Sequence, residues 1–157
     1  MADRTLPASF LSAGQDYLIS LRKLGLDPEA LLWAIDKTLD EFVLVLVTSH
    51  FDFAGPLEVY RLLTKAYNLS ATPKDISPFI IRLHSPRQAV GASVLNWQAD
   101  VRTTDGKRSE TLWIDIDTHD LRYRNSWVYH VRHQKLSPVG RQHQWKRFKN
   151  NIDQFAA

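Results

Sequence analysis

The sequence of 157 residues contains no cysteine and only six glycines. The lack of thiols excludes a disulfide scaffold, a thiolate zinc site, an iron–sulfur cluster and a cysteine nucleophile. The few glycines form no phosphate-binding loop, dinucleotide-binding fingerprint or nucleophile elbow. Since small secreted domains usually carry disulfides, we expect a protein of the reducing cytoplasm, of a kind typical of bacteria.

Long hydrophobic runs are also missing. No run exceeds six residues, the length of residues 42–47, whereas a membrane-spanning helix needs about 20. Residues 1–5 are polar and lead into no apolar core, so no secretory signal is expected. With 44% hydrophobic and 24% charged residues, the composition is that of a folded domain. We therefore expect one soluble cytoplasmic domain spanning residues 1–157, with no membrane partner.

Negative charge is absent from a long stretch near the C-terminus, because no carboxylate lies between Leu121 and Asn151. Residues 121–157 hold eight basic side chains and one acidic side chain, Asp153. The first 120 residues hold 12 basic and 16 acidic side chains. The net charge of +3 thus conceals a basic C-terminal quarter, which bears on the choice of partner.

The N-terminal segment, residues 1–41, is predicted to be helical. Residues 7–25 carry an apolar stripe that ends at a glycine, which is typical of a helix and its stop. A second helix is predicted over residues 27–40, because Asp27 can cap it and Pro28 suits the first helical position. The apolar residues that follow recur at helical spacing.

A sheet with a crossover helix is predicted over residues 42–134. The β-branched run at residues 42–47 predicts a buried strand, Pro56 opens a helix, and residues 79–84 predict a second strand. This order is compatible with a βαβ unit, which would be right-handed if its strands pair in parallel.

The second half of the sequence predicts antiparallel strands and a final helix. Residues 94–103 and 110–118 flank an Asp-Gly pair at 105–106, which favours a hairpin, and residues 127–132 alternate like a third strand. Residues 137–156 predict a basic amphipathic helix. The expected fold is α/β or α+β, with a mixed, partly antiparallel sheet of about five strands, N-terminal helices, one crossover helix and a C-terminal helix.

The basic C-terminal quarter is the first candidate site, because cationic groups attract phosphates and exposed aromatic rings stack on unpaired bases. The predicted contact residues are Arg122, Arg124, Trp127, Tyr129, Arg132, Lys146, Arg147 and Lys149. In the final helix, an apolar stripe is predicted to face the core and turn the cations outward; it comprises Trp145, Phe148, Ile152 and Phe155. Alternatively, the aromatic residues fill the core. The arginines would then pair with acidic residues of the same chain, of a second copy or of an acidic partner protein.

Two smaller candidate sites combine carboxylates with histidines. His50 and Asp52 follow a predicted strand, where ligands collect in open α/β sheets. Asp115, Asp117 and His119 share a strand face and are possible ligands for a divalent metal of a phosphodiesterase or nuclease. The alternative for each group is a polar strand face that simply meets water. No cofactor is expected, although a divalent metal is possible.

Aromatic residues also suggest an interaction module. Trp97, Trp113 and Trp127 fall in predicted strands and, if exposed, would mark a homo-oligomer interface or the surface of a regulator or inhibitor. The alternative is that they lie in the core. Because catalytic motifs are lacking, the sequence favours a non-enzymatic binding protein with nucleic acid as partner. The interaction module and the metal-dependent phosphodiesterase stay open as alternatives.

Overall fold

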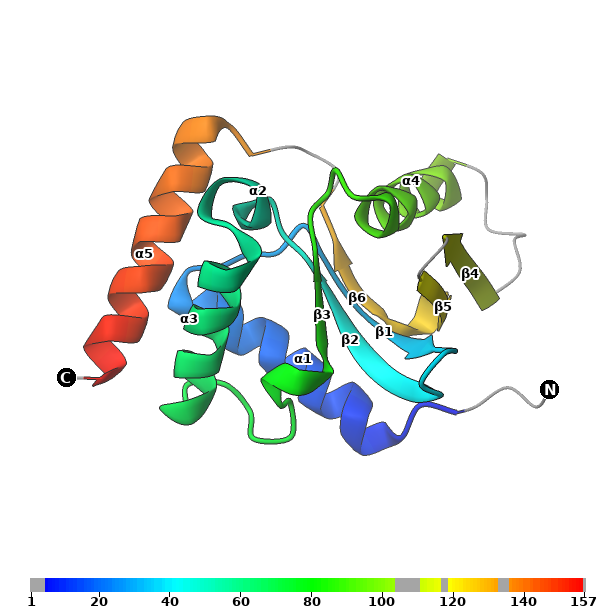
Figure 1. Cartoon of the computed structure of the whole chain (residues 1–157), viewed down its shortest axis with the longest axis horizontal. Coiled ribbons are helices and arrows are strands. Elements are labelled where there is room, and N and C mark those ends of the chain that lie inside the picture. The colour runs from blue at the N-terminus through cyan, green and yellow to red at the C-terminus, as the bar shows by residue number, and fades with distance from the viewer. Residues whose placement is uncertain (1–4, 104–110, 117–118, 133–135, 157) are drawn as a thin grey trace.

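The computed structural model describes residues 5–103, 111–116, 119–132 and 136–156 (Figure 1), and side chains within 5–96, 121–124, 126–132 and 136–155. The helices are α1 (Ala8–Leu24), α2 (His50–Ala54), α3 (Pro56–Asn68), α4 (Ala89–Thr103) and α5 (Pro138–Ala156). The strands are β1 (Ala30–Asp36), β2 (Glu41–Val47), β3 (Ile81–His84), β4 (Thr111–Ile116), β5 (His119–Arg124) and β6 (Val128–Val131). Two short 3-10 turns are η1 (Pro78–Ile80) and η2 (Asn125–Trp127).

Within the described residues, six strands form one mixed sheet in the order β3-β2-β1-β5-β4, with β6 also paired to β1. β1 is antiparallel to β2 along its whole length, and its other edge is shared by β5 and β6. β2 and β3 are parallel and are joined through α2 and α3. The predicted class, a partly antiparallel sheet with helices on both sides of it in the sequence, is confirmed.

The helix predicted over residues 27–40 is wrong, because these residues form β1 and the turn into β2. Residues 30–35 are all buried, and in a short run that is apolar throughout, periodicity does not distinguish a helix from a fully covered strand. The turn is closed by Asp36, whose carboxylate accepts the Thr38 backbone N–H at 3.0 Å. The N-terminal segment is therefore a helix followed by the start of a hairpin.

The strand predicted over residues 94–103 is also wrong, since these residues belong to α4. Val90 and Val94, four residues apart, are both buried, as one face of a helix requires. The hairpin is formed instead by β4 and β5. The predicted turn at 105–106 lies outside the described residues.

The predicted first helix is confirmed as α1. It ends at Gly25, whose φ of +101° is the left-handed conformation that glycine adopts most readily. Near the start of α1, Phe10 stacks on Trp33 of β1 with a centroid distance of 5.3 Å. α1 thus covers the sheet and presents its C-terminal end beside α5 (Figure 1).

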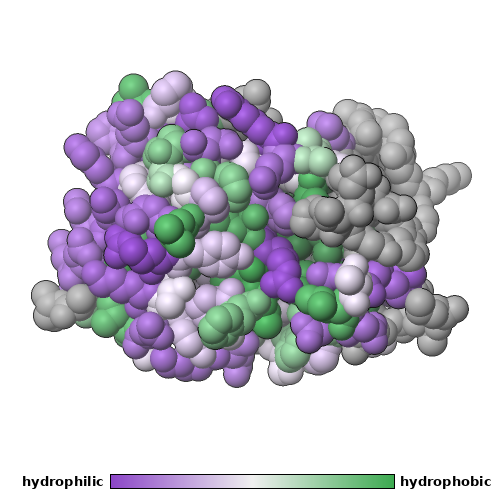
Figure 2. Space-filling model, viewed as in Figure 1, coloured by the Kyte–Doolittle hydropathy of each residue, from purple (hydrophilic) through white to green (hydrophobic). Residues whose placement is uncertain are grey.

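The predicted final helix is confirmed as α5, which packs against α1 and α3 at one end of the molecule (Figure 1). Phe148 and Ile152 are fully buried in this contact. Asn151 adds a hydrogen bond from its side-chain amide to the Leu24 carbonyl, at 2.7 Å. The predicted apolar stripe is wrong at its last member, because Phe155 is 56% exposed. Figure 2 shows mainly hydrophilic side chains over the α5 end of the visible face.

Candidate functional site

Buried polar side chains gather at the edge of the sheet where β2 and β3 end and β1 begins. β2 and β3 are parallel and β1 is antiparallel to β2, so these three chain positions meet at one edge. Burying a polar group is unfavourable unless it is hydrogen-bonded. The buried residues at this edge are Glu29, Thr48, Ser49, His50, His84 and Ser85.

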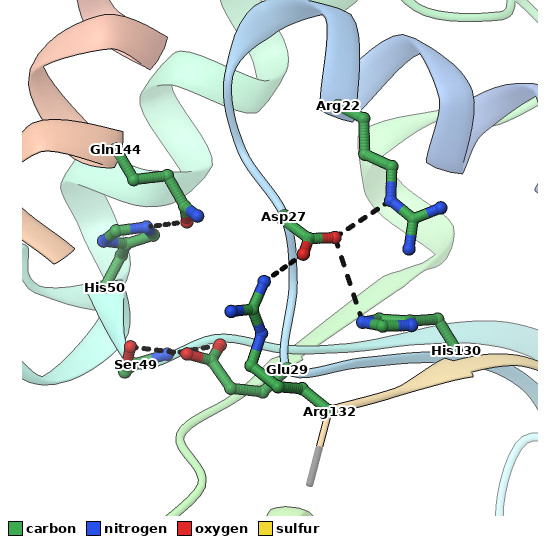
Figure 3. A network of polar contacts seen from close by, with 8 residues as sticks. All are labelled: Arg22, Asp27, Glu29, Ser49, His50, His130, Arg132 and Gln144. Carbon is green, nitrogen blue, oxygen red and sulfur yellow. Dashed lines mark hydrogen bonds and ion pairs between the residues drawn. The ribbon is translucent and has the colours of Figure 1, made fainter. Parts of the chain in front are cut away.

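Glu29 joins the start of β1 to the end of β2. Its carboxylate accepts the backbone N–H of Ser49 at 2.9 Å and the hydroxyl of the same residue at 2.7 Å (Figure 3). Two hydrogen bonds to a charged acceptor satisfy the buried carboxylate and fix the chain where it enters α2.

His50 ties this edge to α5. The side chain is 1% exposed, and its Nε2 lies 2.7 Å from Oε1 of Gln144 on α5 (Figure 3). Because the Gln144 oxygen is an acceptor, Nε2 donates, and Nδ1 of the neutral ring has no partner among the described residues. The rings of Phe53 and Trp145 both pack against the imidazole, at centroid distances of 5.1 and 5.2 Å, and they also contact each other at 6.1 Å.

Burial lowers the pKa of His50 and outweighs the opposing effects of the Gln144 hydrogen bond and the Glu29 charge. His50 is therefore neutral near pH 7. Its neutral ring acts as a hydrogen-bonded anchor for α5 and adds no cation to the surface.

Asp27 is the second anchor. Its carboxylate forms ion pairs with Arg132 at the end of β6 and with Arg22 of α1, the latter at 2.9 Å (Figure 3). His130 lies 3.8 Å away, and its pKa is lowered by burial despite the Asp27 charge. These contacts fix the C-terminal end of α1 against β6, so the two anchors together set the position of α1 relative to α5.

Two adjoining hollows lie between the C-terminal half of α1 and α5, and we call them together the α1–α5 groove. The smaller has a volume of about 320 Å³ and is lined by Arg22, Gly25, Asp27, His143, Gln144 and Arg147. The larger has a volume of about 750 Å³ and is lined by Ser20, Lys23, Leu24, Ser70, Ala71, Arg147, Asn151, Gln154 and Phe155.

Arg147 lines both hollows of the groove. Its aliphatic stem lies across Gly25, where an added Cβ would come within 2.9 Å of the Arg147 Cγ. The missing side chain at Gly25 thus permits a close approach of α5 to the end of α1. Since this approach joins segments more than 120 residues apart, no local pattern in the sequence predicts it.

The predicted basic aromatic surface is not one surface. Lys146 and Arg147 are exposed on α5, whereas Arg122 and Arg124 belong to β5 at the opposite end of the molecule (Figure 1). Arg132 is only 21% exposed and is paired with Asp27. Lys149 lies on the flank of α5 that faces α3, because it acts on the charge of Glu58. The structure therefore brings together only some of the predicted set.

The two aromatic residues predicted to stack are engaged in the fold. Trp127 is 6% exposed and packs edge-on against Phe42 at 5.6 Å, so neither of its faces is open. The Tyr129 hydroxyl donates to the Leu11 carbonyl at 2.6 Å and accepts from Trp33 at 2.8 Å. Burial raises the pKa of Tyr129 to about 12. These contacts agree with the alternative that the aromatic residues fill the core.

His50 and Asp52 lie at the predicted edge but do not converge. They belong to the helix α2 instead of an extended strand end, and residues two apart in a helix point in different directions. Asp52 accepts the Ser85 hydroxyl at 2.6 Å, while His50 contacts α5. The predicted joint ligand site is therefore replaced by two separate structural contacts.

The remaining sequence predictions lie largely beyond the described side chains. Asp117 falls outside the described residues, and only the backbone is described for Asp115 and His119, in β4 and β5. Trp97 is on α4 instead of a strand, and Trp113 is on β4. Within the portion of the chain that the structure describes, no three His, Asp or Glu side chains are placed to hold a metal ion. No helix there has the length and hydrophobicity needed to span a membrane.

Comparison with known proteins adds no relative to this description. No family model matches the chain, and neither the curated proteins nor the solved structures contain a match. The function is therefore inferred from the residues of the site alone.

Proposed function

We propose that the protein binds nucleic acid, and that the α1–α5 groove is the binding surface. The observation that carries the proposal is that Arg147 lines both hollows, with Lys23 and Arg22 across the groove on α1. Cations on both walls of a groove match a phosphate backbone, which is negatively charged along its length.

The charges of the groove favour an anion in spite of one carboxylate. Asp27 lines the smaller hollow, but Arg132 and Arg22 both pair with it and offset its charge. Among the described residues, Lys23 and Arg147 take part in no salt bridge. Their ammonium and guanidinium groups are therefore available to phosphate oxygens.

The rest of the groove provides hydrogen-bonding groups. His143 and Gln144 line the smaller hollow, and Ser20, Asn151 and Gln154 line the larger one. Hydroxyl and amide groups of this kind make many of the contacts by which proteins hold sugars and phosphates. Lys146, which is adjacent to Arg147 in the sequence, is also exposed and adds a further positive charge to α5.

The test is fluorescence-polarisation binding to labelled single- and double-stranded DNA and RNA at about 50 and about 200 mM salt. We expect binding that weakens steeply with salt, because each phosphate contact releases counterions. Arg147→Glu and Lys23→Glu should each weaken binding and reduce the salt slope by about 1 or more.

The matched control is Arg87→Glu, which changes the net charge equally at an exposed residue that lines neither hollow. This variant should bind like the wild type. Equal losses in Arg87→Glu and Arg147→Glu would mean that overall charge, and no particular groove, governs binding. Absence of binding at the lower salt would overturn the proposal and leave an acidic protein as the partner to search for.

A further inference from the structure

Phe155 is an exposed aromatic residue on an otherwise well-packed stripe of α5. Its side chain is 56% exposed, while Phe148, seven residues earlier on the same stripe, is fully buried. Phe155 lines the larger hollow of the α1–α5 groove together with Lys23 and Arg147. The fold does not use this ring to fill the core, and the ring is therefore open to the hollow that it lines.

The larger hollow has the size and the mixed lining of a small-molecule site. Its volume of about 750 Å³ falls within the range of roughly 300–1,000 Å³ that is usual for ligand pockets. The hollow combines one aromatic face, two cations, and the hydroxyl groups of Ser20 and Ser70. An aromatic face next to cations is the combination that binds a flat base attached to a phosphate.

Two side-chain amides stand at the same hollow. Asn151 donates its NH₂ group to the Leu24 carbonyl at 2.7 Å, which orients its oxygen as a fixed acceptor. Gln154, one turn further along α5, is exposed and lines the hollow as well. Amide groups can pair with the edges of a base that is not already paired with another base.

We propose that the larger hollow binds one unpaired base of a single-stranded nucleic acid, stacked on Phe155, with the adjoining phosphates at Arg147 and Lys23. This inference rests on the proposed function and adds that the ligand is a single-stranded nucleic acid. Bases in a duplex are stacked on their neighbours and cannot reach Phe155 without being extruded. The groove therefore prefers a single strand over a duplex of the same length.

The experiment measures the affinity of the full chain for a labelled single strand of about 12 deoxythymidines and for a duplex of equal length. Phe155→Ala should weaken single-strand binding roughly 5- to 150-fold, the range that corresponds to loss of one base–aromatic stack. The same variant should leave duplex binding unchanged. Phe155→Tyr keeps an aromatic face and should bind the single strand like the wild type.

Arg147→Glu distinguishes this inference from the proposed function, since it should weaken the binding of both ligands. If the wild type binds both ligands and Phe155→Ala changes neither affinity, the base-binding site is refuted while the nucleic-acid function stands. If the wild type binds neither ligand, both proposals fail. Melting temperatures of all variants within about 2 °C of the wild type will exclude unfolding as the cause of a loss.

Discussion

Phe148→Ala should strongly destabilise the protein, whereas Phe155→Ala should not. Phe148 is fully buried between α5 and the rest of the fold, and Phe155 is 56% exposed on the same stripe. Truncating a buried phenylalanine costs about 3–5 kcal/mol, because the loss of transfer free energy is accompanied by a cavity. This is a large fraction of a typical total stability of about 5–15 kcal/mol. Truncating the exposed ring should cost less than about 1 kcal/mol.

The assay is urea and thermal unfolding followed by tryptophan fluorescence and circular dichroism. For a chain of 157 residues, the loss at Phe148 corresponds to a fall in Tm of roughly 6–20 °C. The two variants remove the same atoms from the same helix, so each controls for the other. Equal destabilisation by both would mean that Phe155 is packed as tightly as Phe148, which would contradict an open hollow at the end of α5.

Three further predictions concern the two anchors and the packing of α1 against β6. Asp27→Asn should lower the free energy of unfolding by about 1–2 kcal/mol, because Arg132 loses the partner that offsets its partial burial; an unchanged urea midpoint would contradict this role. Gly14→Ala should cost about 1–3 kcal/mol, because the new Cβ overlaps the Tyr129 hydroxyl, and a Tm equal to that of the wild type would count against this packing. Burial lowers the pKa of His50 in the folded state, so the imidazole is protonated at a higher pH in the unfolded chain than in the folded protein. The wild type should therefore lose stability relative to His50→Gln as the pH falls from about 7 to 5.5. A pH-independent difference between the two unfolding curves would refute a neutral, buried His50.

Sequence signals that mark the start or the end of a helix are sufficient to predict that helix. Gly25 ends α1, Pro56 opens α3 and Pro138 opens α5, as the conformational limits of these residues require. The β-branched run of β2 is also predictable, and its parallel pairing with β3 is the arrangement that a βαβ unit requires. In each case the decisive residues are close together in the sequence.

Local signals mislead where the residues that carry them serve distant contacts. Asp27 resembles a helix cap, but its carboxylate pairs with Arg132, 105 residues away. Glu29 resembles a first-turn acid, but it holds Ser49 at the end of β2. Because tertiary contacts override local preference here, residues 27–36 form a loop and a strand.

The sequence predicts which kind of charge the candidate site carries, but it does not predict which segments form the site. The carboxylate-free stretch correctly marks α5 as cationic, since this follows from composition alone. The other wall of the groove comes from α1, and nothing in the sequence relates Lys23 to Arg147 before the helices pack. The sequence predicts that Trp127 or Tyr129 stacks on a base, but burial within the fold decides which aromatic faces stay open. Of the four residues in the predicted stripe of α5, all of which the structure describes, only Phe155 is exposed.

Titration of the ¹⁵N-labelled protein with a short single-stranded oligonucleotide, followed by amide chemical shifts, tests the central claim most directly. We predict that the largest shifts arise along the two walls of the α1–α5 groove, at Lys23, Arg147 and Phe155, and that they diminish as salt is added. Shifts centred instead on Arg122 and Arg124 of β5, or no shifts at low salt, would contradict a nucleic-acid site in this groove.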